Sequence, residues 1–194
     1  QKSVIGEIAP TPGVHGVALA PDLGRGFTSN GADATVTDFD LQTLATLQTL
    51  KVAGTKPDSI LYDSFTQRVF TFNGNSDNAS AFDAVTGEAL GTIELGGGPE
   101  FAVSDGAGNC YVNLEEAAVV VRIDPKNLAV TARWPLAPGA AATALALDKA
   151  NHRLFSGCRS KNLMVLNSDT GAIVANLPIG GGVGKIFHFG KLPV

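Results

Sequence analysis

The sequence is poor in charged residues, in aromatic residues and in cysteine. Charged residues make up 16% and aromatic residues 7% of the 194 positions, whereas hydrophobic residues make up 44%, so the chain can bury a core. The formal net charge of -4 argues against a protein whose main task is to hold nucleic acid, because affinity for phosphates comes from clustered Lys and Arg. Two cysteines, Cys110 and Cys158, are too few for a disulfide scaffold and lack redox, haem or zinc spacings.

Several other signals are missing. No apolar run approaches the roughly 18 residues that a membrane span requires, and no helical periodicity is long enough for a core helix. The chain starts at Gln1 without a basic-then-apolar leader, so we expect a removed signal peptide or a trimmed start. Its three histidines are scattered, no Gly-x-Ser-x-Gly elbow is present, and 180–185 lacks the first Gly and the final Ser or Thr of a phosphate loop. We therefore predict neither a cofactor nor a metal.

What the sequence does contain is an internal repeat of about 43 residues. Each of four units begins with a short apolar run, at 16–20, 59–63, 100–104 and 144–148. An aromatic residue follows about ten positions later, as Phe27, Phe70, Tyr111 and Phe155. Further along come an apolar residue before Asp or Asn, and a last apolar run that ends in glycine at 50–54, 93–98, 134–139 and 177–182. These four features recur in the same order and at the same spacing in all four units. They indicate repeated units of four short strands.

The turn residues agree with strands. The segments 83–87 and 167–171 start with Asp or Asn and end with Gly, which suits a turn that needs a positive φ. The equivalent segment 124–127 contains Pro125 and ends on Asn127, for which we expect a left-handed backbone.

A four-stranded unit of this length predicts an all-β protein, a β-propeller of four-stranded antiparallel blades at approximately 14–54, 55–98, 99–139 and 140–182. We expect 4–9 to be the outermost strand of a preceding blade and 183–190 the innermost strand of a following one. Because a seven-bladed ring needs roughly 300 residues, we expect part of a seven-bladed propeller or an arc that closes by association with another copy.

The first strand of each unit carries small residues, as the crowded axis of a propeller requires. These are Ala18, Ala20, Ala102, Ala144 and Ala146. We expect larger residues of the same strands to pack toward adjacent blades, namely Val17, Leu19, Ile60, Val103, Leu145 and Leu147.

The Asn-Gly pairs at 30–31 and 73–74, the Asp-x-x-Thr-Gly turn and the Gly-Gly-Gly before the next unit resemble the YVTN-type bacterial β-propellers, including YncE-like and surface-layer proteins. The third unit departs from the pattern, with Asn113-Leu114 in place of Asn-Gly. The resemblance implies an exported, periplasmic or extracellular, mostly noncatalytic WD40-like repeat protein of bacteria. It also implies single-stranded nucleic acid as a possible ligand, which the acidic balance disfavours.

Strand alternation places two classes of loop on one rim, and polar side chains around a channel mouth are the default binding site of a propeller. The candidate ligand-binding residues on this rim are His15, Asn30, Lys56, Asp58, Asn73, Glu100, Asn113 and Arg159.

The first functional prediction is a noncatalytic binding or scaffold module that presents this rim to an unknown protein or small-molecule ligand, with self-association possible. One alternative is a propeller enzyme, lactonase-like or dehydrogenase-associated, with His15, Asp58 and Glu100 as the acid–base candidates. Another is a structural component of a surface layer or envelope.

Overall fold

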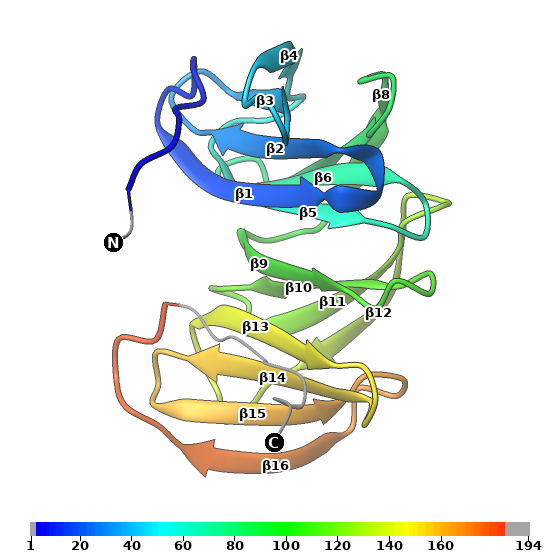
Figure 1. Cartoon of the computed structure of the whole chain (residues 1–194). Helices are drawn as coiled ribbons and strands as arrows, with labels where there is room; N and C mark the ends of the chain where they lie inside the picture. Colours follow the sequence, from blue (N-terminus) through cyan, green and yellow to red (C-terminus); the bar gives the residue numbers. More distant parts are fainter. Residues whose placement is uncertain (1–2, 185–194) are drawn as a thin grey trace, which may run out of the picture.

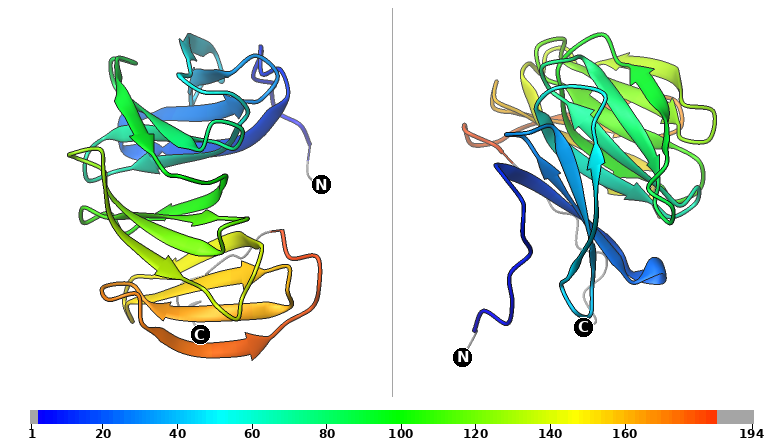
Figure 2. Two further views of the ribbon diagram at one scale, coloured as in Figure 1. Left: turned by 180° about the vertical axis from the view of Figure 1, so that it is seen from behind. Right: turned by 90° about the horizontal axis from the view of Figure 1, so that it is seen from above.

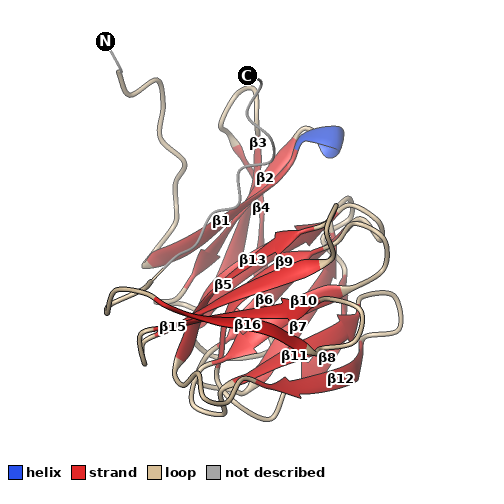
Figure 3. Cartoon of the chain, turned by 90° about the horizontal axis from the view of Figure 1, so that it is seen from below, coloured by secondary structure: helices blue, strands red, loops and turns tan. Residues whose placement is uncertain are grey.

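The computed structural model describes residues 3–184, and within them nearly all regular structure is β-strand (Figures 1 and 3). In this described part of the chain, sixteen strands form four sheets, each made of four consecutive antiparallel strands. The described residues contain one short 3-10 helix, η1 (Pro21–Leu23), and no helix long and apolar enough to cross a membrane. The predicted all-β class is confirmed.

The four sheets, called blades 1 to 4, follow the order of the chain. Blade 1 contains β1 (Val14–Ala20), β2 (Arg25–Asn30), β3 (Thr35–Asp40) and β4 (Thr46–Lys51). Blade 2 contains β5 (Pro57–Asp63), β6 (Arg68–Asn73), β7 (Asn78–Asp83) and β8 (Ala89–Glu94). Blade 3 contains β9 (Pro99–Ser104), β10 (Cys110–Leu114), β11 (Val119–Asp124) and β12 (Ala129–Pro135). Blade 4 contains β13 (Ala142–Asp148), β14 (Arg153–Cys158), β15 (Asn162–Asn167) and β16 (Ile173–Pro178).

The blades fan out so that the first strand of each lies toward the middle of the molecule and the fourth lies at its periphery (Figures 1 and 2). The innermost strands contact one another in sequence, β1 with β5, β5 with β9 and β9 with β13. This radial arrangement of four-stranded sheets is that of β-propeller blades. Blades 1 and 4 are the two ends of the fan.

Each pair of neighbouring blades buries one apolar cluster. Phe27 of blade 1 packs with Ile60 and Val69 of blade 2. Equivalent clusters join blades 2 and 3 around Phe70, and blades 3 and 4 around Tyr111. Full burial of a large apolar side chain contributes about 1.5–3 kcal/mol, and a single sheet has no second layer to provide it. The blades therefore depend on their neighbours, as the repeat predicts.

The turns after the third strands confirm part of the prediction. Gly87 and Gly171 have φ angles of 76° and 75°, as expected for turns that need left-handed glycine. In blade 3 the left-handed residue is Leu128, at φ 54°, so the expectation for Asn127 is wrong by one position. Leu44 occupies the equivalent position of blade 1 at φ 61°. The left-handed backbone at this turn position is therefore kept even in the two blades that have leucine there in place of glycine.

The two ends of the fan also differ from expectation. Residues 4–9 form no strand, so the predicted outer strand of a preceding blade is wrong. This segment instead lies near blade 1, where Thr37 Oγ1 and Thr46 Oγ1 donate hydrogen bonds to the carbonyls of Pro10 and Ala9. Of the predicted strand at 183–190, residues 183–184 form no strand and the rest lies outside the described residues.

The innermost strand of blade 1 is not packed as expected. Val17 and Leu19 are 59% and 55% exposed, whereas Ile60 and Leu145, which were expected to pack in the same way, are 9% and 1% exposed. The physical reason is that Val17 and Leu19 lie on the face of blade 1 that points away from blade 2.

Candidate functional site

One residue in the innermost strand of each blade is left out of the regular ladder. In blade 2, Pro57 pairs with Asn73 and Ser59 pairs with Phe72, so Asp58 forms a β-bulge. The same irregularity occurs near the start of β1, β9 and β13. In β9 the gap in the ladder covers Glu100 and Phe101, and Glu100 is the one that directly follows the paired Pro99, as Asp58 follows Pro57. The four residues at this position, called the bulge residues below, are His15, Asp58, Glu100 and Thr143. A bulge bends the strand and changes the direction of a side chain, which is why bulges are common beside functional sites.

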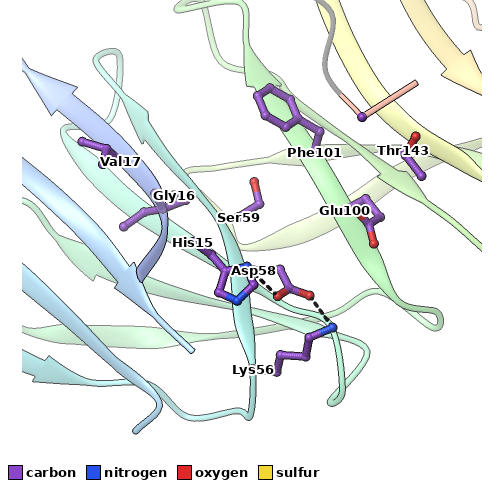
Figure 4. A pocket seen from close by; sticks show the side chains of 11 residues that line it. His15, Gly16, Val17, Lys56, Asp58, Ser59, Glu100, Phe101 and Thr143 are labelled. Carbon is purple, nitrogen blue, oxygen red and sulfur yellow. Dashed lines mark ion pairs between the residues drawn. The ribbon is translucent and has the colours of Figure 1, made fainter. Parts of the chain in front are cut away.

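All four bulge residues line one cavity of about 680 Å³, which we call the axial cavity (Figure 4). It lies between the innermost strands of the four blades, and its lining also includes Lys56, Ser59, Phe101 and Gly184. A cavity of this size is within the range of small-ligand sites. The repeated bulge therefore gathers four side chains from distant parts of the sequence at one place.

Asp58 is the centre of the polar contacts in the axial cavity (Figure 4). Lys56 Nζ lies 3.0 Å from Asp58 Oδ2, and His15 Nδ1 lies 3.5 Å from Asp58 Oδ1. The hydrogen bond to Asp58 and the charge of that carboxylate raise the pKa of Lys56. The Asp58 side chain is only 15% exposed, and its buried Oδ1 has no hydrogen-bond partner, because 3.5 Å without suitable geometry is too weak a contact. A buried oxygen without a partner is unfavourable, so a donor from a ligand would stabilise this carboxylate.

Glu100 is the second carboxylate of the axial cavity. Burial, followed by interaction with the Glu115 carboxyl and the charge of Asp58, raises the pKa of Glu100 to about 7. Arg159 acts in the opposite direction and forms an ion pair with Glu115. A bound cation would also act in the opposite direction to burial and lower the pKa of Glu100, which favours the carboxylate.

A second cavity of about 330 Å³, called the side cavity, opens from the same residues. It shares Lys56, Asp58 and Glu100 with the axial cavity. Its remaining charged lining is acidic, namely Asp77, Glu115 and Glu116. Acidic groups outnumber basic ones in the combined site, which gives it a negative potential at neutral pH.

The structure brings half of the predicted rim residues together. His15, Lys56, Asp58 and Glu100 line the axial cavity. Arg159 lines neither cavity but forms an ion pair with Glu115, which lines the side cavity. Their role in ligand binding stays a prediction, since no ligand contact is present to assign it.

The three predicted asparagines have a different environment. Asn30 Nδ2 donates to Thr35 and Thr37, and Asn73 Nδ2 donates to Asn78 and Ser80, all within their own blades. Asn30, Asn73 and Asn113 are each 0% exposed and do not line the axial or the side cavity. The hydrogen bonds of Asn30 and Asn73 tie neighbouring strands of their own blades together. The ligand-binding role of all three asparagines stays a prediction.

Asn113 also occupies a different register from the other two. Asn30 pairs with Thr35 and Asn73 with Asn78, whereas in blade 3 the residue at this ladder position is Leu114, which pairs with Val119. A shift of one residue moves a side chain to the opposite face of a sheet. Asn113 therefore faces blade 4, where its Nδ2 donates to the carbonyl of Ala144 at 2.8 Å.

Sequence reasoning missed Thr143 and Phe101, and it did not include Glu115 or Glu116 among the candidate residues. Thr143 completes the set of bulge residues, and its Oγ1 donates to the carbonyl of Val183 at 2.6 Å. The available signal was positional, since His15, Asp58 and Thr143 each precede the first mark of the repeat by one residue. Among residues 3–184, no group of three or more His, Cys, Asp or Glu is placed to hold a metal ion. Cys110 and Cys158 are buried free thiols.

Comparison with solved structures supports the fold. The chain is similar to hydrazine synthase of Kuenenia stuttgartiensis, with a TM-score of 0.78, 19% identity and coverage of 92% of this chain and 53% of that one. It is also similar to the β-propeller domain of Cps50 (Swd1) of Myceliophteria thermophila, with a TM-score of 0.78, 15% identity and coverage of 93% and 59%. The chain thus spans little more than half the length of either structure.

No protein-family model and no curated protein matches the chain. The solved structures, at identities below 20%, show the fold alone. The fold shown by topology and comparison is therefore the β-propeller, whereas the WD40-like and YVTN-type resemblances stay predictions.

Proposed function

We propose that the protein is a noncatalytic β-propeller binding module whose axial and side cavities bind a ligand carrying a positively charged organic group. The observation that carries the proposal is Asp58, a largely buried carboxylate with one oxygen unpartnered, facing the same cavity as Glu100. An ammonium or guanidinium group supplies the N–H donor that Asp58 Oδ1 lacks, and charge-assisted hydrogen bonds of this kind are among the stronger ones. The partner is a small amine or a Lys- or Arg-containing segment of another protein.

The electrostatics support a cation over an anion. The two cavities together contain Asp58, Asp77, Glu100, Glu115 and Glu116 against Lys56 and His15. A cation beside Glu100 favours its ionised form, so binding is coupled to release of a proton. Affinity is then expected to increase as the pH rises through about 7, the pKa of Glu100 in the free protein.

The proposal keeps the wider context that the sequence predicts. We infer a YVTN-type bacterial module, exported to the periplasm or cell surface, that presents this rim to its partner. Single-stranded nucleic acid remains a disfavoured ligand, because the net charge is -4 and the cavities are acidic.

Calorimetric titration with spermidine and with a short Arg- and Lys-containing peptide tests the proposal. We expect binding that weakens with salt, increases between pH 6 and pH 8 and falls at least about tenfold in Asp58→Asn and in Glu100→Gln. Glu88→Gln is the matched control, because it removes one negative charge from an exposed turn in blade 2, outside both cavities. If Glu88→Gln and Glu100→Gln weaken binding equally, the loss of affinity comes from net charge alone, which would contradict the proposed site.

A second candidate function is an acid–base enzyme of the lactonase-like or dehydrogenase-associated kind. The observation that favours it is the pKa of about 7 at Glu100, together with the proximity of His15 and Asp58. The test is an assay of hydrolysis with a panel of lactones and esters. Activity with a bell-shaped pH profile that is lost in Glu100→Gln would support the enzyme and contradict the noncatalytic binding module.

A further inference from the structure

The axial cavity and the side cavity meet at one wall, called the shared wall, which is formed by Lys56, Asp58 and Glu100. The two carboxylate oxygens of Asp58 lie toward different cavities. His15 lines the axial cavity and not the side cavity, and its Nδ1 lies 3.5 Å from Oδ1 (Figure 4). Gly74 lines the side cavity and not the axial cavity, and a Cβ added to it would lie 2.6 Å from Oδ2. A ligand can therefore reach this wall from both sides.

The side cavity extends to Asp58 because residue 74 is glycine. The backbone of Gly74 is not left-handed, so the requirement for glycine at this position is one of space. At 2.6 Å from Oδ2, a Cβ would be closer than side-chain atoms normally approach, and the carboxylate would have to move. The absence of a side chain at Gly74 thus leaves Asp58 open to the side cavity.

The shared wall already holds one ammonium group. Lys56 Nζ lies 3.0 Å from Asp58 Oδ2, whereas the buried Oδ1 has no hydrogen-bond partner. The contact with Lys56 shows which kind of group fits this carboxylate. Oδ1 can accept a charge-assisted hydrogen bond from a second group of the same kind on the axial side.

The charge of the two cavities exceeds what one ammonium group can neutralise. Their lining contains five carboxyl groups, those of Asp58, Asp77, Glu100, Glu115 and Glu116. Two cations pair with them, the ammonium of Lys56 and the guanidinium of Arg159. With Glu100 ionised and His15 neutral, five negative charges against two positive ones leave three uncompensated. A ligand with two ammonium groups therefore matches the site better than a ligand with one.

Two features favour a small aliphatic ligand over a peptide. The axial cavity has an apolar part, lined by Val17, Ile60 and Phe101, against which methylene groups can be buried. Beside the shared wall, the backbone carbonyls of Lys56 and Gly98 already accept hydrogen bonds of 2.9 and 3.1 Å from backbone N–H groups. A peptide main chain would find these acceptors engaged, whereas an aliphatic chain requires none.

We propose that the ligand is a linear diamine or polyamine that crosses the shared wall, with one ammonium group at Asp58 Oδ1 and another at the acidic groups of the side cavity. These acidic groups are Asp77, Glu115 and Glu116. The inference rests on the proposed function and adds the chemical class of its ligand. Because the two ammonium groups are linked, the second binds intramolecularly once the first is bound, which increases the affinity. A positive group beside Glu115 also offsets the repulsion between its carboxylate and that of Glu100.

Calorimetric titration of the 194-residue chain at pH 8 tests the proposal, since Glu100, with a pKa of about 7, is then mostly ionised. Diamines from 1,3-diaminopropane to 1,8-diaminooctane are each compared with the monoamine of the same carbon number. We expect the best diamine to bind at least about tenfold more tightly than its monoamine, well beyond the roughly twofold gain that two equivalent ends provide. The affinity should peak at one chain length, because a short linker cannot span the wall and a long one lowers the effective concentration.

Substitutions locate the two ends of the ligand. Asp58→Asn should weaken the monoamine and the diamine by similar factors, at least about tenfold. Asp77→Asn should instead lower the ratio of diamine to monoamine affinity by at least about threefold, because it removes a carboxylate from the side cavity only. Glu88→Gln lies outside both cavities and should leave this ratio unchanged. Binding of the monoamine to Asp77→Asn shows that this variant is folded.

The outcomes separate this inference from the proposed function. A diamine that binds no more tightly than its monoamine, or a gain that is equal at every chain length, would overturn the inference. Binding of the monoamine that is lost in Asp58→Asn would in that case keep the proposed function. A peptide with two Lys residues that binds more tightly than every diamine would overturn the assignment to a small ligand. Absence of binding for all the amines and the peptide would overturn both proposals.

Discussion

Asn113 of blade 3 and Ser156 of blade 4 form a hydrogen bond across the interface between their blades. Ser156 Oγ donates to Asn113 Oδ1 at 3.1 Å, and both side chains are fully buried. Asn113 also donates to the carbonyl of Ala144. The two blades are thus joined by polar contacts as well as by the apolar cluster around Tyr111.

Asn113→Ala is expected to destabilise the protein by about 1–3 kcal/mol, because it leaves buried polar groups of blade 4 without partners. Ser156→Ala should cost less, and the double variant should show that the two effects are not additive. Urea unfolding measures the differences, with Asn75→Ala in an exposed loop as the control. Additive effects of the two substitutions would contradict a direct coupling.

Glu100→Gln is expected to increase stability at high pH. Burial raises the pKa of Glu100 from 4.5 to about 7, so between these values the folded chain holds a proton that the unfolded chain has released. Stability therefore falls as the pH rises through this interval, and an uncharged amide removes that loss. At pH 8 the gain should be about 1 kcal/mol, after screening of a half-buried group, or roughly 2–4 °C in Tm.

The gain should disappear below about pH 3.5, well under the unfolded pKa of 4.5, where Glu100 is protonated in both states. Thermal melts at about pH 3 and pH 8 measure it, with Glu88→Gln as the exposed control. An equal gain at both pH values would show that the effect of Glu100→Gln does not come from ionisation.

Asp83→Ala should lower stability at neutral pH by about 1 kcal/mol. Asp83 Oδ1 accepts hydrogen bonds from the backbone N–H groups of Val85 and Thr86 at 2.9 and 2.8 Å, and chiefly the bond from Thr86 lowers the pKa of this carboxyl. Because the folded pKa is depressed, this contribution is lost as the pH falls through it. Urea titrations at pH 7 and pH 3 measure the effect.

Asp83→Asn is the matched substitution, because Asn167 makes the same two contacts in blade 4. It should keep most of the stability and remove the acid dependence of this turn. A cost equal to that of Asp83→Ala would show that charge matters more than the hydrogen bonds.

Gly171→Ala should destabilise blade 4 strongly. Gly171 has a φ of 75°, and an added Cβ would lie 2.2 Å from Trp134 Cδ1, on the ring that stacks with Tyr111. Gly24→Ala is the control, because Gly24 has a φ of 66° but no atom within 4 Å of an added Cβ. We expect Gly24→Ala to lower the free energy of unfolding by about 1 kcal/mol, from backbone strain alone. Gly171→Ala should lower it by more than about 3 kcal/mol.

The fluorescence of Trp134, the single tryptophan of the sequence, should shift in Gly171→Ala and stay unchanged in Gly24→Ala. Similar unfolding energies for both variants would mean that Trp134 moves aside at little cost.

The sequence predicts the blades well because repeated packing leaves repeated marks. Phe27, Phe70 and Tyr111 lie on second strands and are buried between blades, and Gly87 and Gly171 have the expected left-handed backbone. These features follow from local turn chemistry and from the alternation of strand faces, both of which are written in short segments.

The site was harder to predict, because it depends on ladder register. The repeat marks the position of Thr143 but does not show that the strand bulges there, so Thr143 was missed. Asn113 was aligned one position away from its structural equivalent for the same reason, since register is not visible in the repeat. The raised pKa of Glu100 depends on Glu115, which a different loop supplies. The exposure of Val17 depends on which face of its blade has a neighbour, and the residues of that strand do not show this.

The bulges have one more consequence. A bulge residue makes no regular pair in the strand ladder, so a different side chain can stand there without breaking that pairing. His15, Asp58, Glu100 and Thr143 already differ in charge, size and hydrogen-bonding capacity while sharing one strand position. New ligand preferences could therefore arise by single substitutions at these four sites, at little cost to the contacts that hold neighbouring sheets together.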